Sequence, residues 1–349
     1  PFKQRRCSLV LATGVFLGLL TAGCSQMEQA TKPSSATPDW ILSGDHTADA
    51  FLNECKQRYA QVNDHVSVFD TTNTPLSDIQ VLEKLNEIYI LIDKQLNAAS
   101  LYANVHPIDA VRTNADQCER HWVSLLTDLG LSQPIYQRLK QIDIDALPAL
   151  EQRLVKKNLE DFERSGVDKN RKTRERIRAL NDEIAQIGQT FDKNIREGGK
   201  TFIVPSVDGL KGLPEDYINA HPPKEDGTIT LSTAYPDYVP FMQYAEDDEL
   251  RRQFYILYRQ QAYPQNKVVL EQLLRKRHEL ARLLGYKNYA HYVTADKMIE
   301  SPEKAQLFID QVSKIADQKS QQEYQELLAR LRQDQPHAAQ VSDWQKLYL

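Results

Sequence analysis

The chain has 349 residues and a formal net charge of −5 at pH 7. That length can bury a large hydrophobic core, so one large or two ordinary domains are expected and disorder is not the default. Glycine, at 13 residues, is about half as frequent as average, and charged residues make up 26% of the chain. This composition predicts a mainly helical protein. The acidic balance, without a compensating basic face, excludes nucleic acid as a partner.

The first 23 residues are typical of a bacterial export signal. Basic residues near the start precede the apolar run 9–20, which is too short to span a bilayer but has the length of a signal-peptide core. Positions 21–23 hold small residues directly before Cys24, as at the cleavage site of bacterial lipoproteins. We therefore expect cleavage before Cys24 and a lipid anchor on that cysteine. An ordinary secretory signal or a buried cysteine is the alternative.

The stretch after the cysteine is interpreted as a tether. Residues 24–44 are rich in Ser, Thr, Gln, Ala and Pro without an apolar period, which predicts flexibility. Ser25, rather than aspartate, follows the cysteine, and in a host with two membranes this favours the outer membrane with the protein facing the periplasm. Because Pro1 is not a methionine, we expect residues to be missing at the start, and we also expect the chain to be cut at Leu349.

Residues 45–146 predict an N-terminal helical subdomain, because leucine and isoleucine recur there at helical spacing. With Cys7 in the signal and Cys24 lipidated, Cys55 and Cys118 remain as an even pair in an oxidising compartment. A disulfide between two helices of this subdomain is expected. Two separate buried thiols are the alternative.

Residues 147–349 begin with the cleanest helical period in the chain. Apolar side chains spaced by three or four residues predict one long core-facing helix, which ends at Gly198. They are Ile177, Leu180, Ile184, Ile187, Phe191 and Ile195. The segments 202–204 and 228–231 then predict a small antiparallel strand pair near 200–232.

Helices resume near Asp247, whose acidic neighbours are interpreted as first-turn stabilisation rather than as an acid/base or calcium site. An apolar stripe over 269–284 predicts a helix that stops at Gly285. Ser301 and Pro302 supply a cap and a preset first turn for the last long helix.

Several segments, taken in order, resemble the zinc oligopeptidases of the M3, or thimet oligopeptidase, family. The resemblance covers approximately 147–349 and includes Leu-Leu-Gly-Tyr at 283–286 and the Trp344 segment. In the latter, Gln345 stands where the family usually has aspartate, and Leu349 where it has a second tyrosine. Further matching segments are 162–167, 178–181, 212–216, 229–231, 235–240, 244–251, 266–281, 288–290, Met298 and 301–302.

The resemblance implies the N-terminal part of a mainly helical, two-lobed, channel-type metallopeptidase that hydrolyses short peptides. In the family, the His-Glu-x-x-His helix and the other ligands of its single zinc ion follow the Trp344 segment. No catalytic or metal-binding residue is therefore expected within this chain, and the zinc ligands are expected beyond Leu349. The pair His278 and Glu279 is only an imitation, because Arg282 stands where the second histidine would be.

Three tyrosines, Tyr235, Tyr238 and Tyr244, are candidates for lining a substrate channel, because a phenol offers both apolar contact and a hydrogen bond to a peptide. Core packing is the alternative for them. A second hypothesis for the whole chain is a non-catalytic helical lipoprotein that binds peptides or a partner protein.

Overall fold

The computed structural model describes residues 47–69 and 76–349, and these belong to one compact unit that begins at Asp45. The signal, Cys24 and the whole of the tether 24–44 lie outside the described residues. The helices are α2 (Ala48–Ser67), α3 (Asp78–Val105), α4 (Asp109–Gly130), α5 (Gln133–Lys140), α6 (Ala149–Ser165), α7 (Arg171–Glu197), α8 (Glu215–Ala220), α9 (Tyr235–Tyr244), α10 (Asp248–Arg259), α11 (Gln265–Leu283), α12 (Tyr289–Thr294) and α13 (Pro302–Asp334).

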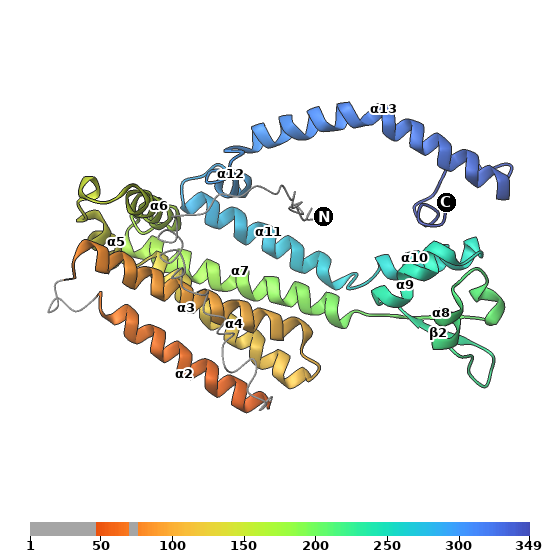
Figure 1. Ribbon diagram of the computed structural model, residues 1–349, viewed down its shortest axis with the longest axis horizontal. Coiled ribbons are helices and arrows are strands. Elements are labelled where there is room, and N and C mark those ends of the chain that lie inside the picture. The colour runs from red at the N-terminus through yellow and green to blue at the C-terminus, as the bar shows by residue number, and fades with distance from the viewer. Residues whose placement is uncertain (1–46, 70–75) are drawn as a thin grey trace, which may run out of the picture. The chain divides into compact units, whose positions relative to one another are not determined.

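Helices dominate the described residues, and their one sheet is the antiparallel pair β1 (Thr201–Val204) and β2 (Ile229–Ser232) (Figure 1). The predicted fold class, mainly helical with a small antiparallel element near 200–232, is confirmed. None of the described helices is long and apolar enough to cross a membrane. The subdomain boundary predicted at 147 falls just after the 3-10 turn Ile144–Ala146 and stays a prediction.

Helices α2, α3 and α4 pack against one another around a mostly aliphatic core. Local signals start them: the Thr47 hydroxyl accepts from the Ala50 amide, and Ser77 forms a capping box with Gln80. The structure joins Cys55 of α2 to Cys118 of α4 in a disulfide, with the two Cα atoms 6.1 Å apart. Large buried side chains of this core are Leu85, Ile88, Ile92, Trp122 and Leu129.

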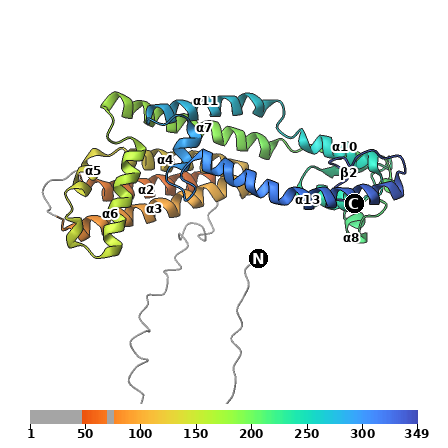
Figure 2. The same cartoon turned by 90° about the horizontal axis from the view of Figure 1, so that it is seen from above.

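The predicted long helix is α7, which lies beside α11 in both views (Figure 1, Figure 2). Only the first part of its apolar stripe is fully buried: Ile177 and Leu180 are buried, whereas Ile195 is 41% exposed. The prediction that the whole stripe faces the core is therefore wrong at its C-terminal end. Sequence periodicity shows which face is apolar, but the extent of its cover depends on the neighbouring helix.

Gly285 ends α11 as predicted. Its φ of 95° is left-handed, and the amides of Gly285 and Tyr286 donate to the carbonyls of Arg282 and Ala281. This pair of bonds is a Schellman motif, which satisfies carbonyls at the end of the helix. The predicted stripe on α11 is likewise only partly covered, since Leu274 is 55% exposed.

The sheet, α9 and α10 share a core of aromatic side chains. Phe202 of β1 stacks on Phe254 of α10, with ring centroids 4.5 Å apart, and Phe241 of α9 meets Phe254 edge to face. The side chain of Asp247 caps α10 by accepting from the Leu250 amide, and Asp248 pairs with Arg251. These contacts agree with the interpretation of the acidic run as first-turn stabilisation.

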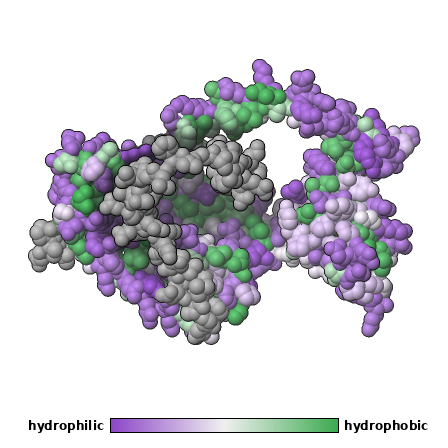
Figure 3. Space-filling model, viewed as in Figure 1, coloured by the Kyte–Doolittle hydropathy of each residue, from purple (hydrophilic) through white to green (hydrophobic). Residues whose placement is uncertain are grey.

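Helix α13 starts at the predicted cap, where the Ser301 hydroxyl accepts from the Lys304 amide. Its first half carries exposed apolar side chains, visible as hydrophobic atoms along this helix (Figure 3). Its last turns bury Leu328 and Leu331 against Val341. The exposed apolar side chains are Leu307, Phe308, Ile309, Val312 and Ile315.

The last nine residues, 341–349, return to α10. The Gln345 amide donates to both carboxylate oxygens of Asp248, at 3.1 Å each. The Arg251 guanidinium lies over the Tyr348 ring, 3.8 Å from its centroid. This polar contact fixes the segment 341–349 beside α10.

Candidate functional site

A tyrosine-lined pocket of about 390 Å³ opens between α9, α10 and the segment 341–349. Its volume lies within the range of small-ligand sites. Helical spacing places Tyr235, Tyr238, Val239 and Met242 of α9 on one wall. The other walls are Tyr255, Tyr258 and Arg259 of α10, and Asp343, Lys346 and Leu347.

Stacked phenol rings form the floor of this tyrosine pocket. The rings of Tyr238 and Tyr258 are nearly parallel, with centroids 3.9 Å apart, and Tyr238 also meets Phe254 edge to face. Burial raises the pKa of Tyr238 to about 12, so its hydroxyl stays protonated at neutral pH. Tyr235 is 70% exposed at the rim. The pocket thus offers apolar faces together with phenol hydrogen-bond donors.

The three ionised side chains of the pocket are unevenly paired. The Lys346 ammonium lies 2.6 Å from a carboxylate oxygen of Asp343, and hydrogen bonds from Lys346 and then Tyr255 lower the pKa of Asp343. Arg259 instead lies over the Tyr255 ring, 5.1 Å from its centroid. A hydrogen bond to the Tyr255 phenol raises the pKa of Arg259. Among the described residues, no carboxylate lies within ion-pair distance of the Arg259 guanidinium.

Two of the three tyrosines singled out from the sequence, Tyr235 and Tyr238, line this pocket. Tyr244 does not line it and is 49% exposed at the end of α9. The role of these tyrosines in a substrate channel stays a prediction. Sequence reasoning missed Arg259, although its spacing of four residues from Tyr255 places both on one face of a helix.

His278 and Glu279, the pair that only imitates a zinc motif, lie on the surface of helix α11. Glu279 of α11 lies 2.6 Å from the Arg176 guanidinium, and the position one turn after His278 is held by the cation Arg282. A permanent cation does not fit a zinc site. Within 47–69 and 76–349, no group of three or more His, Cys, Asp or Glu side chains is placed to hold a metal ion.

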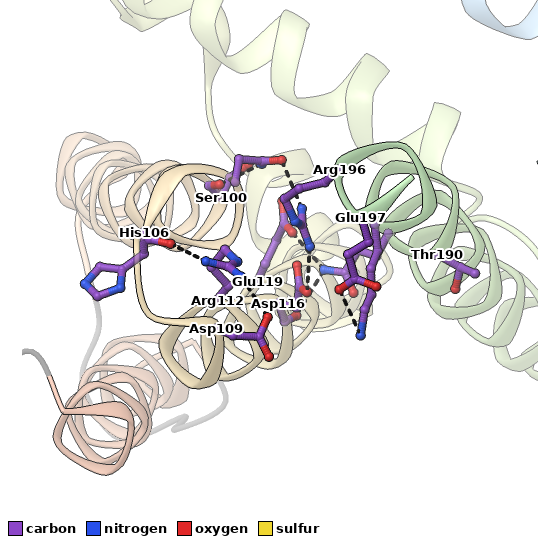
Figure 4. A network of polar contacts seen from close by, with 12 residues as sticks. Ser100, His106, Asp109, Arg112, Asp116, Glu119, Thr190, Arg196 and Glu197 are labelled. Atoms are coloured by element: carbon purple, nitrogen blue, oxygen red, sulfur yellow. Dashed lines mark hydrogen bonds and ion pairs between the residues drawn. The ribbon is translucent and has the colours of Figure 1, made fainter. Parts of the chain in front are cut away.

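A polar network joins α4 to α3 and α7, and its role is structural (Figure 4). Arg196 of α7 lies 3.6 Å from the Asp116 carboxylate and donates to Asn104 of α3. Burial raises the pKa of Asp116, although Arg196 opposes this shift. Gln189 of α7 bridges to Glu119 of α4 at 2.7 Å. Because these groups hold one another, the network serves to dock α7 on α4.

A second cavity, of about 380 Å³, is lined by side chains of α4, α6, α7, α11 and α12 and of the residues that follow α4 and α11. Its walls are mostly aliphatic, including Ile177, Leu280 and Leu284, and none of its lining side chains is charged. Four of its lining residues, Leu131, Ile177, Leu280 and Leu284, belong to one core cluster, so the cavity borders the hydrophobic core of these helices.

Comparison with known proteins finds similarity to peptidases. The profile of Peptidase family M3 matches residues 241–348, which include α10 and all but the last residue of the segment 341–349. Oligopeptidase A of Escherichia coli (strain K12) is 30% identical over 296 residues, covering 80% of this chain and 42% of the relative.

Two further relatives agree. Oligopeptidase A of Salmonella typhimurium is 30% identical over 197 residues, which are 52% of this chain and 29% of that protein. Mitochondrial intermediate peptidase of Chaetomium globosum is 26% identical over 275 residues, 77% of this chain and 35% of that protein. The chain thus spans less than half the length of these relatives. It belongs to peptidase family M3.

Proposed function

We propose that this chain is the N-terminal part of a zinc-dependent oligopeptidase that hydrolyses peptide bonds in short peptides. The observation that carries the proposal is the family match over 241–348, because that segment also forms most of the tyrosine pocket. The relatives that support it are named oligopeptidases and an intermediate peptidase.

In this proposal the zinc site lies outside residues 1–349. The single zinc ion of the proposed enzyme would be held by residues beyond Leu349, as the family resemblance implies. Residues 1–349 alone are then expected to be inactive. Their part in the enzyme would be to bind and select the peptide.

Selection would work through shape and hydrogen bonding. A channel walled by helices admits an extended oligopeptide and excludes a folded protein. Tyr235, Tyr238 and Tyr258 would offer apolar contact and hydroxyl donors to such a peptide.

Export to the periplasm and a lipid anchor at Cys24 complete the proposal. Disulfides persist in oxidising compartments, and the bond between Cys55 and Cys118 fits a protein that works there. The anchor would hold the enzyme at the outer membrane through the tether 24–44, where it would meet peptides in the periplasm.

The test is hydrolysis of a quenched fluorescent peptide of about ten residues by the product of the complete reading frame, with residues 1–349 measured alongside. Cleavage that stops on chelation and returns with zinc is expected only from the complete product. The same sequence placed inside a folded protein should resist cleavage. Failure of the complete product to cleave any peptide in a mixed library would contradict the proposal.

The alternative is a non-catalytic helical lipoprotein that binds peptides with the same scaffold. Two departures from the family's usual residues favour it slightly, Gln345 in place of aspartate and Leu349 in place of the second tyrosine. A stop codon directly after Leu349 would support this alternative, and a His-Glu-x-x-His helix encoded downstream would exclude it.

A further inference from the structure

The tyrosine pocket combines an apolar interior with one cation, Arg259, that has no ion-pair partner among the described residues. Lys346 and Asp343 form an ion pair, and Arg259 also acts on Asp343 through its charge, so the three side chains leave one positive charge in excess in the pocket. Arg259 is held against the Tyr255 ring, so its planar group is already oriented at the pocket wall. A guanidinium that lacks a carboxylate partner is a ready site for one, because it can donate two parallel hydrogen bonds to it.

The rest of the pocket suits an apolar side chain. Tyr238 and Tyr258 present a stacked aromatic surface, and Val239, Met242 and Leu347 add aliphatic walls. Met242 is almost fully buried, so it packs from beneath the pocket. Aromatic faces favour aromatic and aliphatic partners through burial and edge contacts.

We propose that this pocket binds the C-terminal residue of a peptide, with its free carboxylate on Arg259 and its apolar side chain against Tyr238 and Tyr258. This inference rests on the proposed function, since it assigns part of peptide recognition to this chain. It names the preferred ligand as a short peptide that ends in an apolar or aromatic residue with an unblocked carboxylate.

The remaining charges of the pocket are compatible with an anion there. Asp343 would repel a carboxylate, but Lys346 and Tyr255 already bind it, and the side chains of Arg259, Lys346 and Asp343 sum to one positive charge. The protonated hydroxyl of Tyr238 can donate to a peptide carbonyl. Both polar ends of a terminal residue would thus find a partner.

The test is fluorescence anisotropy with residues 1–349 and a five-residue peptide ending in phenylalanine, labelled at its N-terminus. The free acid should bind about tenfold more tightly than the C-terminal amide, which corresponds to one charge-assisted hydrogen bond. A peptide ending in glycine should also bind more weakly than the one ending in phenylalanine. Equal binding of acid and amide would overturn the proposal.

Two variants on the same helix separate the site from general charge. Arg259→Gln should abolish the preference for the free acid. Arg252→Gln is the matched control, because Arg252 is paired with Glu249 at 2.7 Å and does not line the pocket. Circular dichroism should show both variants folded, since neither side chain is buried. A preference that survives Arg259→Gln, or one that Arg252→Gln also removes, would overturn the assignment.

Inorganic phosphate provides the last control. If millimolar phosphate displaces both peptides equally, the pocket is a general anion site and the proposal is wrong. The outcome is independent of hydrolysis. An acid preference in residues 1–349, together with an inactive complete product, would contradict the proposed enzyme and leave this binding site standing.

Discussion

The helices α2, α3, α4, α7 and α11, here called the helical core, are held differently from the aromatic module, which comprises residues 200–259 and 341–349. The helical core packs aliphatic side chains and adds a disulfide. The aromatic module packs phenylalanine and tyrosine rings around Phe254. Each region has a cavity, but only the one in the aromatic module is lined by charged groups.

The difference shows how tyrosine side chains, which carry a hydroxyl on an aromatic ring, can form a ligand-binding pocket. An aliphatic side chain that leaves a gap exposes only more hydrocarbon. A tyrosine can bury its ring in the core and present its hydroxyl to the same gap. The pocket of the aromatic module therefore offers both apolar contact and hydrogen-bonding groups. A bound peptide requires both.

The largest effect is expected from removal of the central ring of the aromatic module. Phe254 is fully buried and contacts Phe202, Phe241 and Tyr238. Phe254→Ala should lower the free energy of unfolding by about 3–5 kcal/mol and abolish peptide binding at the tyrosine pocket. Urea denaturation measures the loss, with Phe308→Ala as control, because Phe308 is 60% exposed. If Phe254→Ala lost no more unfolding free energy than the control, the aromatic module would not depend on this ring.

In the helical core, the disulfide is the feature whose removal is expected to reduce stability, as Phe254 is in the aromatic module. Replacing Cys55 and Cys118 together by serine should lower the free energy of unfolding by about 2–4 kcal/mol. Hydrogen exchange should locate the loss in α2 and α4, and the anisotropy assay should show peptide affinity unchanged. If peptide affinity fell in parallel with stability, the two regions would not be independent.

A smaller effect is expected at the contact that fixes the segment 341–349. Gln345 is buried and its amide donates to both oxygens of Asp248. Gln345→Ala should cost about 1–3 kcal/mol, because it leaves the Asp248 carboxylate with fewer donors. It should also weaken peptide binding, since Asp343, Lys346 and Leu347 form one wall of the pocket.

Aspartate, the family's usual residue at position 345, gives a second test of the contact between Gln345 and Asp248. Gln345→Asp would place a second carboxylate beside Asp248 and should destabilise the protein more at pH 7 than at pH 4. Thermal unfolding at the two pH values measures this. Equal stability of Gln345→Asp and the natural chain at pH 7 would contradict the role given to the amide.

The smallest effect is a pH dependence within the aromatic module. Burial tends to raise the pKa of Asp237, but hydrogen bonds from Ser232 and His221 outweigh it and lower the pKa overall. A lowered pKa stabilises the folded state above about pH 4, the ordinary range of aspartate, and this contribution is lost as the pH falls through the folded value. Melting temperatures from pH 5 to pH 2.5 should fall less steeply for Asp237→Asn than for the natural chain.

Local signals in the sequence were sufficient for much of the fold. Ser301 and Pro302 begin α13, Gly285 ends α11, and the antiparallel pair lies where β-branched residues are bounded by prolines. Each of these depends on neighbours in sequence, so capping and turn chemistry predict it.

The tyrosine pocket could be predicted only in part, because its walls are far apart in sequence. Tyr235 and Tyr238 stand out by residue type, but Asp343 and Lys346 reach them only after the segment 341–349 folds back onto α10. Likewise, the period of α7 identified an apolar face but not that Ile195 would be 41% exposed. Contacts between distant segments set both outcomes.

The most direct test of the central claim, that this chain is the peptide-selecting part of a zinc peptidase, is zinc stoichiometry by mass spectrometry. Both residues 1–349 and the product of the complete reading frame should be purified without chelator. We expect one zinc per molecule in the complete product and none in residues 1–349. Zinc absent from both, or one zinc held tightly by residues 1–349, would contradict it.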